Sequence, residues 1–156
     1  MAATHFLKLA NDIIGDSREP AHMGWIEALS LSTDIQPTRT ISRAAPPPSH
    51  WIGITKRVDR ASAALMNAIA NATLFDWAIL DVPSANFYLA MRVVLLDGYH
   101  VGGRHGQSEP LETVGLACSS IEYKPGKAPA RLAAMTLGSE GGTRLALAVL
   151  RRLNEA

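Results

Sequence analysis

The sequence predicts a mainly β domain, a sandwich or barrel, with one short helix after the third strand and a second helix near the C-terminus. Three observations support this fold class. Several segments alternate apolar and polar residues with the period of a strand, or are apolar on both faces. One segment near residue 65 has apolar residues at helical spacing. The last 30 residues are rich in Pro, Gly and Ala before a final amphipathic stretch.

The first two predicted strands are His5–Ala10 and Trp25–Ser32, joined through a turn at Gly15-Asp16-Ser17. In the second strand the apolar phase changes between Ala28 and Leu29. This change predicts a bulge, or burial on both faces.

A long loop, residues 33–50, follows these strands. Its Pro46-Pro47-Pro48 run is stiff and extended. The loop carries Arg39 and Arg43 but no acidic residue after Asp34, so it is locally basic. A loop of this length in a compact domain is usually functional or disordered.

The stretch Trp51–Leu80 reads as a strand, a charged turn, a helix and a further strand that is apolar on both faces. Ile52 and Ile54 lie on one face of the first strand. A charged edge follows, and we interpret it as solvated or as part of an intersubunit salt bridge rather than as a nucleic-acid site, because no aromatic platform accompanies it. Its members are Lys56, Arg57, Asp59 and Arg60.

The predicted helix spans only about three turns, so it must pack on an apolar surface to be stable. Asp59 or Ser62 is expected to cap its N-terminus. Leu65 and Ile69 belong to its apolar stripe and are its expected core residues, and Asn71 is the expected left-handed stop.

Two longer strands follow, Asn86–Leu96 and Leu111–Tyr123, separated by the flexible loop Asp97–Pro110. The first is apolar on both faces, with Leu89, Met91, Val93 and Leu95 expected on one of them, so both faces should be covered. In the second the phase slips before Ile121, and three residues are expected to point inward: Val114, Leu116 and Cys118.

Length and composition exclude several classes. The 156 residues argue for one globular unit, and 47% hydrophobic residues suffice for a normal core. The net charge of +1 gives no bulk attraction to nucleic acid or anionic membrane. Cys118 is the single cysteine, which excludes an intrachain disulfide and a cysteine zinc site. The N-terminus has no basic start followed by an apolar run, so we expect synthesis in the cytoplasm without a signal peptide and no membrane helix.

No set of residues forms a recognisable catalytic constellation, and we expect no enzyme activity, no metal and no cofactor. His100, His105 and Glu109 share a Gly-rich loop, but their spacing matches no strong metal signature. Cys118 lies mid-strand among apolar neighbours, where an inert buried thiol is expected. Asp76 and Asp81 should point to opposite faces, which makes them a poor acid–base pair.

Six motifs occur in order over about residues 4 to 125. They are FLKL (Phe6–Leu9), GDS with charged residues (Gly15–Glu19), IEALSLS (Ile26–Ser32), ITKRVDRAS followed by Leu65 (Ile54–Ser62), FYLAMRVVLLDGY (Phe87–Tyr99) and ETVGLACSSIEY (Glu112–Tyr123). In this order and spacing the chain resembles the Hcp (haemolysin-coregulated protein) family, which forms the inner tube of bacterial type VI secretion systems.

The resemblance implies an Hcp-like β-barrel of two sheets flanked by a helix. Six copies would close into a ring, and rings would stack into a tube that is driven out by a contracting sheath behind a spike. Small effector proteins would travel in the lumen, and the protein would leave the cell through the machine itself. By position, the 33–50 loop matches the family's projecting loop, in which we expect the ring-stacking residues to be Thr38, Arg39, Ile41 and Arg43.

Two departures from the family pattern are visible. The projecting loop is Pro-rich rather than Gly-rich, and the chain ends in a helix rather than a short strand. We therefore divide the chain into an Hcp-like barrel, residues 1–125, and a divergent tail with a helix, residues 126–156. Two alternative functions stay open: a small-molecule binding or catalytic barrel with the His100–Glu109 loop as its mouth, and a phage-like tail-tube subunit.

Overall fold

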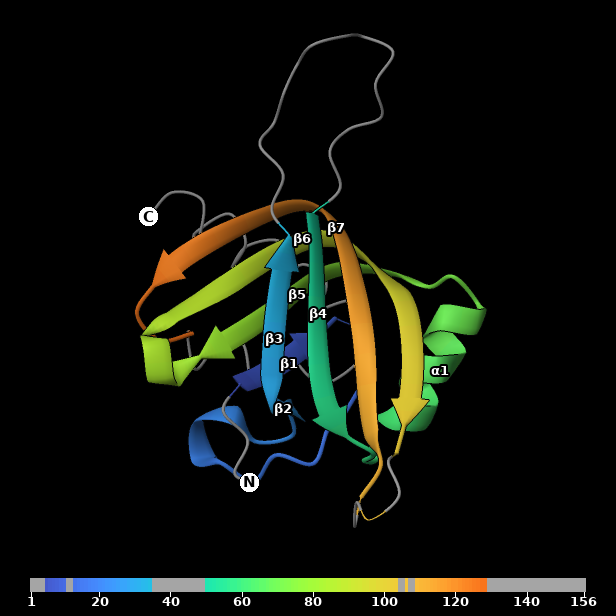
Figure 1. The fold of residues 1–156 in the computed structure, drawn as a ribbon. Coiled ribbons are helices and arrows are strands. Elements are labelled where there is room, and N and C mark those ends of the chain that lie inside the picture. The colour runs from blue at the N-terminus through green and yellow to red at the C-terminus, as the bar shows by residue number, and fades with distance from the viewer. Residues whose placement is uncertain (1–4, 11–12, 35–49, 104–105, 107–108, 129–156) are drawn as a thin grey trace, which may run out of the picture.

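A computed structural model describes residues 5–10, 13–34, 50–103, 106 and 109–128 (Figure 1). Its elements in chain order are β1 (His5–Leu9), the 3-10 turn η1 (Pro20–His22), β2 (Ile26–Ala28), β3 (Ser30–Asp34), β4 (His50–Arg57), α1 (Ser62–Ala70), β5 (Leu74–Val82), the 3-10 turn η2 (Pro83–Ala85), β6 (Phe87–Gly102) and β7 (Leu111–Pro125). The predicted mainly β class, with one short helix after the predicted third strand, is confirmed.

The seven strands form one continuous antiparallel sheet in the order β2-β1-β5-β6-β7-β4-β3. The two ends of this order, β2 and β3, are consecutive in the chain and separated only by Leu29, whose amide donates a 2.7 Å hydrogen bond to the carbonyl of Thr55. The sheet therefore curls into a nearly closed barrel. The phase change predicted after Ala28 is this break, where the chain passes from one end of the sheet to the other.

A kink in β6 at Val93 changes which side chains face the interior. Leu89 and Met91 are fully buried, whereas Val93 is 51% exposed and has a positive φ of 50°. Beyond this kink the buried residues are Val94 and Leu96, one position out of the earlier alternation. The prediction that Val93 shares a face with Leu89 was therefore wrong. The long strands β6 and β7 curve together over the barrel, as Figure 1 shows.

Two element boundaries also differ from the prediction. The strand expected to end at Leu96 continues to Gly102, because a bulge between Leu96 and Tyr99 takes up the irregularity and pairing with β7 resumes. Gly98, with φ 106°, supplies a backbone conformation there that other residues rarely adopt. At the end of α1 the left-handed residue is Ala72, with φ 48°, and not Asn71.

The barrel interior is filled by side chains. Fully buried residues from six strands and the helix include Leu7, Ile26, Ile52, Ile54, Leu65, Leu80, Leu89, Val114 and Leu116. Helix α1 lies beside the C-terminal half of β6 (Figure 1), with Leu65 in the core and Ile69 packed at its margin, as predicted. This filled interior counts against a small-molecule barrel with its site inside the protomer. The expected C-terminal helix and the 35–49 part of the basic loop lie outside the described residues.

Candidate functional site

A buried charged pair joins β4 to β7 at the end of the barrel where α1 begins. Lys56 follows Ile52 and Ile54 in the inward phase of β4, so its side chain enters the barrel instead of solvent. Glu112 lies directly opposite it on β7. Both side chains are completely buried. A buried charge is stable only when it is paired and its hydrogen-bonding groups are satisfied.

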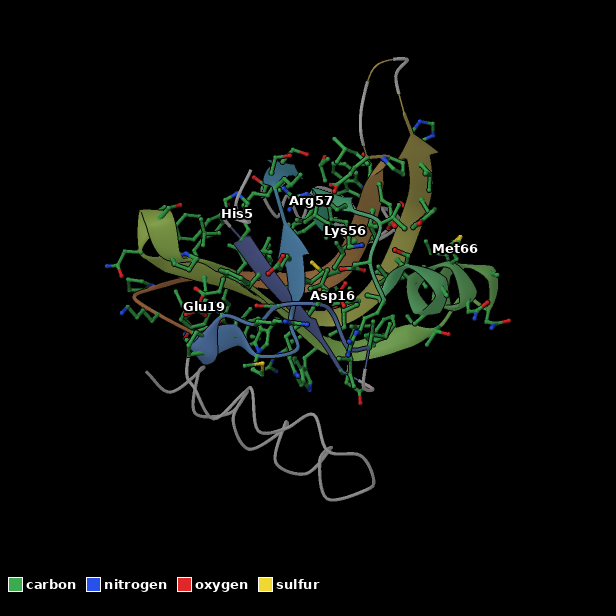
Figure 2. The ribbon with its side chains drawn as sticks, turned by 90° about the horizontal axis from the view of Figure 1, so that it is seen from below. His5, Asp16, Glu19, Lys56, Arg57 and Met66 are labelled. Atoms are coloured by element: carbon green, nitrogen blue, oxygen red, sulfur yellow. The ribbon has the colours of Figure 1, made fainter. Side chains whose placement is uncertain are left out.

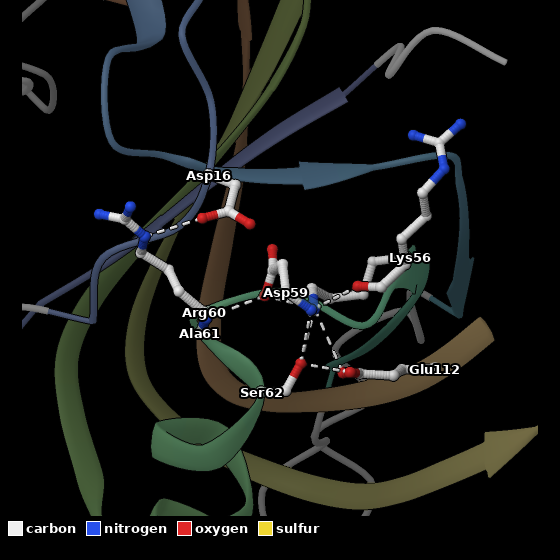
Figure 3. A network of polar contacts seen from close by, with 8 residues as sticks. Asp16, Lys56, Asp59, Arg60, Ala61, Ser62 and Glu112 are labelled. Carbon is white, nitrogen blue, oxygen red and sulfur yellow. Dashed lines mark hydrogen bonds and ion pairs between the residues drawn. The ribbon is translucent and has the colours of Figure 1, made fainter. Parts of the chain in front are cut away.

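The Lys56 ammonium is surrounded by acceptors (Figure 3). It donates to the carbonyl oxygen of Arg57 at 2.7 Å, to Asp59 Oδ1 at 2.9 Å and to Glu112 Oε2 at 3.2 Å. The Ser62 hydroxyl donates to the other carboxylate oxygen, Glu112 Oε1. The Ser62 hydroxyl oxygen lies 3.5 Å from the ammonium as a fourth acceptor, so the three ammonium protons are all satisfied inside the protomer.

The same residues shape the turn into α1. Asp59 Oδ1 accepts the amide of Ala61 at 2.9 Å, and the Ser62 hydroxyl accepts the amide of Asp59 at 2.9 Å. The helix N-cap is Ala61, which has no side-chain hydrogen bond. The predicted cap is therefore replaced by a turn in which Asp59 and Ser62 fix each other and tie the helix start to Glu112.

Tyr99 on β6 adds a phenol to this cluster. Burial, and after it the hydrogen bond to the Glu112 carboxylate, raise the pKa of Tyr99 to about 12. The neutral phenol is therefore the form that the folded protein stabilises. The cluster links β4, β6, β7 and α1 through polar contacts and so holds these elements together at this end of the barrel.

Two ion pairs lie on the surface outside the Lys56–Glu112 cluster. Arg60 Nε is 2.8 Å from Asp16 Oδ1, and Arg57 Nε is 3.1 Å from Glu109 Oε2, with all four side chains at least one-third exposed. Arg57 and Arg60 thus agree with the predicted charged edge. Lys56 and Asp59 do not, because the inward phase of β4 places Lys56 in the interior and the Asp59 side chain, 9% exposed, pairs with it there. Whether this edge meets a neighbouring subunit stays a prediction.

Large apolar side chains are exposed at several places, including Val101, Tyr123 and two separate regions. Ile14 and Met23 line a surface hollow with Asp16 and Arg60, and Val58 lines an adjoining hollow that also includes Asp16. The second region contains Met66 on the outer face of α1, Leu74 at the start of β5 and Val93 at the β6 kink. Figure 2 shows Asp16 near the middle of the view and Met66 at the right.

A second buried charged cluster lies at η1, on the opposite side of Figure 2 from Met66, where Glu19 is labelled. His22 stacks on Phe6 with ring centroids 4.1 Å apart and packs edge-on against Trp25 at 5.0 Å. Its Nε2 is 2.5 Å from Asp81 Oδ2, and its Nδ1 contacts the Glu19 carboxylate. The hydrogen bond with His22 holds the pKa of Glu19 below its usual range. The cluster fixes η1 against β1 and β5.

The other residues considered from the sequence carry no catalytic arrangement. Cys118 is buried, and burial raises its pKa to about 11, so the thiol is inert as predicted. Asp76 is exposed while Asp81 is buried, which agrees with their predicted separation. His100 is exposed and His105 lies outside the described residues. Within the described part of the chain, no group of three His, Cys, Asp or Glu side chains is placed to hold a metal, and no helix has the length and apolarity to span a membrane.

Sequence reasoning missed both buried clusters, for different reasons. Lys56 and Glu112 each continue an inward alternation, after Ile54 and before Val114 respectively, and this phase was a usable signal. His22 and Asp81 are 59 residues apart, so no local pattern connects them.

The fold and the sequence match known proteins. A family model described as "Type VI secretion system effector, Hcp" matches residues 6–124. Hcp1 from Salmonella typhimurium is 25% identical, with a TM-score of 0.68 over 80% of this chain and 87% of that one. Hcp3 from Pseudomonas aeruginosa is 14% identical, with a TM-score of 0.62 over 80% and 92%.

A more distant likeness is the sheath-tube complex of an extracellular contractile injection system, at 9% identity and a TM-score of 0.53 over 80% of this chain and 90% of that one. The comparison with curated proteins gives no significant match.

Proposed function

The chain belongs to the Hcp family of type VI secretion systems, whose members are structural tube proteins, and from this membership we propose that six copies close into a ring and that rings stack into the inner tube. The observation that carries the proposal is the family match over residues 6–124, which coincides with the nearly closed barrel. A structural role also fits a protomer whose interior is packed with side chains.

The distribution of exposed apolar side chains supports a head-to-tail ring. A cyclic contact of this kind needs two different complementary patches on each protomer. We assign these two patches to the surface around Ile14, Met23 and Val58 and to the surface around Met66 and Leu74, which lie on different elements of the barrel. Apolar side chains of this size would be buried by neighbours in an assembled ring.

We assign the charged edge and the basic loop to the contacts between subunits. In this proposal Arg57, Asp59 and Arg60 lie at or near the edge between ring neighbours, while Lys56 supports that edge from inside the protomer. The ring-stacking contacts are proposed for the basic loop, at Thr38, Arg39, Ile41 and Arg43.

The barrel, residues 1–125, is proposed as the unit of assembly, and residues 126–156 as an appended tail. The end of the family match at residue 124 supports this division. The proposed partners are further copies of the chain, the spike and sheath proteins of the machine, and small effectors in the lumen. Secretion through the machine is the proposed route to the outside.

Native mass spectrometry of the full chain over a range of concentrations tests the ring. We expect a species with the mass of six protomers, and we expect Arg57→Glu to reduce it relative to Lys127→Glu, which makes the same charge change away from the proposed edge. A monomer at every concentration would contradict the proposal. An equal effect of the two variants would contradict the assignment of the edge but not the ring.

A phage-like tail-tube subunit is the alternative that the fold also permits, since a contractile injection system is among the similar structures. Both alternatives are tube subunits and both predict rings. The identity of the neighbouring genes would distinguish them.

A further inference from the structure

A pocket of about 350 Å³ lies beside the second buried cluster, outside the barrel interior. Its walls are mostly apolar, and its polar lining consists of two carboxylates, one histidine and one lysine at the surface. The residues that line it are Phe6, Glu19, Ala21, His22, Asp81, Pro83, Lys127 and Ala128. They come from β1, η1, the end of β5, η2 and the segment after β7, so five parts of the chain converge on one hollow.

One carboxylate oxygen in this lining lacks a partner. Asp81 is 2% exposed, and its Oδ2 is engaged by His22. Its Oδ1 is buried and has no hydrogen-bond partner among the described residues. A buried carboxylate oxygen without a donor is costly, and native proteins rarely leave one without a purpose. This oxygen therefore marks a place where a donor from outside would be stabilised.

The surroundings specify the chemistry of that donor. Both nitrogens of the His22 ring already face carboxylates, Glu19 and Asp81, so the histidine has no nitrogen left to bind a ligand. A carboxylate oxygen forms its strongest hydrogen bonds with charged donors such as ammonium and guanidinium groups. Apolar walls at Phe6, Pro83 and Ala128 would pack against an aliphatic stem. The volume lies at the lower end of the range for ligand pockets.

We propose that this pocket binds an ammonium or guanidinium group carried on a short apolar stem, with the cation donating to Asp81 Oδ1. Such a group occurs on small free amines and on lysine or arginine side chains of another polypeptide. The exposed Lys127 would repel a cation, so we expect its affinity for the pocket to be modest. This binding does not depend on ring formation.

Ligand-observed NMR titrations of the full chain test the proposal at any assembly state. The probes are n-butylguanidinium, n-butanol, which has the stem without the cation, and methylguanidinium, which has the cation without the stem. We expect saturable binding of n-butylguanidinium that is tighter than that of either control. Equal binding of n-butanol and n-butylguanidinium would overturn the proposal.

Variants place the binding at Asp81. Asp81→Asn should weaken n-butylguanidinium binding by about tenfold or more, because a hydrogen bond to a charged group is lost. The matched control is Asp76→Asn, which removes an exposed charge from the same strand and should leave affinity unchanged. Equal effects of the two variants would overturn the proposal.

Lys127→Glu keeps the test decisive if Asp81→Asn fails to fold, because Lys127 is exposed and outside the barrel core. It should tighten binding of the cation by several-fold, and unchanged or weaker binding would overturn the proposal.

The source of the cation is tested with an Ala-Arg-Ala peptide, blocked at both ends, and its citrulline analogue. Selective binding of the arginine peptide, tighter than that of the small probe, supports a polypeptide source. Binding of the small probe alone supports a free amine.

Discussion

The two buried charged clusters of this barrel differ in how completely their polar atoms are paired. Around Lys56, four acceptors surround the three ammonium protons, and Glu112 has a donor at each carboxylate oxygen. Around His22, Asp81 faces a pocket and has one oxygen with no hydrogen-bond partner among the described residues. The difference teaches that burial of charge does not by itself indicate function. The paired cluster stabilises the fold, whereas the incompletely paired one is available for a ligand.

The largest effect should come from breaking the paired cluster. Glu112→Ala leaves the buried Lys56 ammonium with Asp59 as its one remaining opposite charge and removes the acceptor of the Ser62 hydroxyl, which should lower the free energy of unfolding by about 3–5 kcal/mol. Urea denaturation with a constant m-value measures this. The control is Glu122→Ala, which removes an exposed partner of Lys124 and should cost less than about 1 kcal/mol. A cost below 1 kcal/mol for Glu112→Ala would contradict the structural role.

The apolar side of the same junction gives the next effect. Leu65→Ala removes a fully buried side chain from the face of α1 that packs on the barrel, and should cost about 2–4 kcal/mol. Met66→Ala, one residue later and 47% exposed, is the matched control and should change stability little in an isolated protomer. Thermal melting compares them. Unchanged melting of Leu65→Ala would show that the helix does not anchor this end of the barrel.

Weakening the open cluster should cost less. His22→Ala removes the partner of Asp81 Oδ2 and the stacked ring on Phe6, and should cost about 1–3 kcal/mol. Hydrogen exchange should quicken at η1 and at the β1–β5 pairing while the exchange around α1 stays slow. Uniform faster exchange over the whole barrel would mean that the two clusters are not independent.

Alkaline pH distinguishes the clusters by titration of Tyr99. Its folded pKa of about 12 lies above its ordinary value of 10.0, so the unfolded state loses the proton first. The contribution of Tyr99 to the free energy of unfolding is therefore fully present below about pH 10 and is lost as the pH rises toward about 12. Denaturation at several pH values should show this fall in the wild type, and Tyr99→Phe should reduce it. An identical alkaline slope in the variant would contradict the raised pKa.

The smallest effect concerns acid pH at η1. The pKa of Glu19 is lowered by its hydrogen bond to His22, so its contribution is present above the ordinary glutamate range and is lost as pH falls through the folded value. Glu19 is largely exposed, so the change should be seen as local loosening of η1 in hydrogen exchange. Glu19→Gln should remove the pH dependence. Acid loosening that persists in this variant would point to another group.

The sequence predicted the strands and α1 well, because each has a clear period. It also located one irregularity through its phase, the break after Ala28. The kink at Val93 could not be predicted, since a β-branched residue rarely takes a positive φ and tertiary packing imposes it. Lys56 was predicted at the surface because lysine side chains are usually exposed, although the alternation of β4 directs this one inward.

The candidate sites were less predictable than the fold. The contact of His22 with Asp81 depends on β1 pairing with β5, and the chain gives no local sign of that pairing. The pocket likewise needs five segments brought together by the barrel. The expected ring-stacking residues Thr38, Arg39, Ile41 and Arg43 lie outside the described residues and stay predictions.

Electron microscopy of the purified full chain tests the tube assignment most directly. Two-dimensional averages of negatively stained particles should show rings with six-fold symmetry, and crowded samples should show rings stacked on a common axis. Fields of single small particles without rotational symmetry, in protein that is folded and concentrated, would contradict the account.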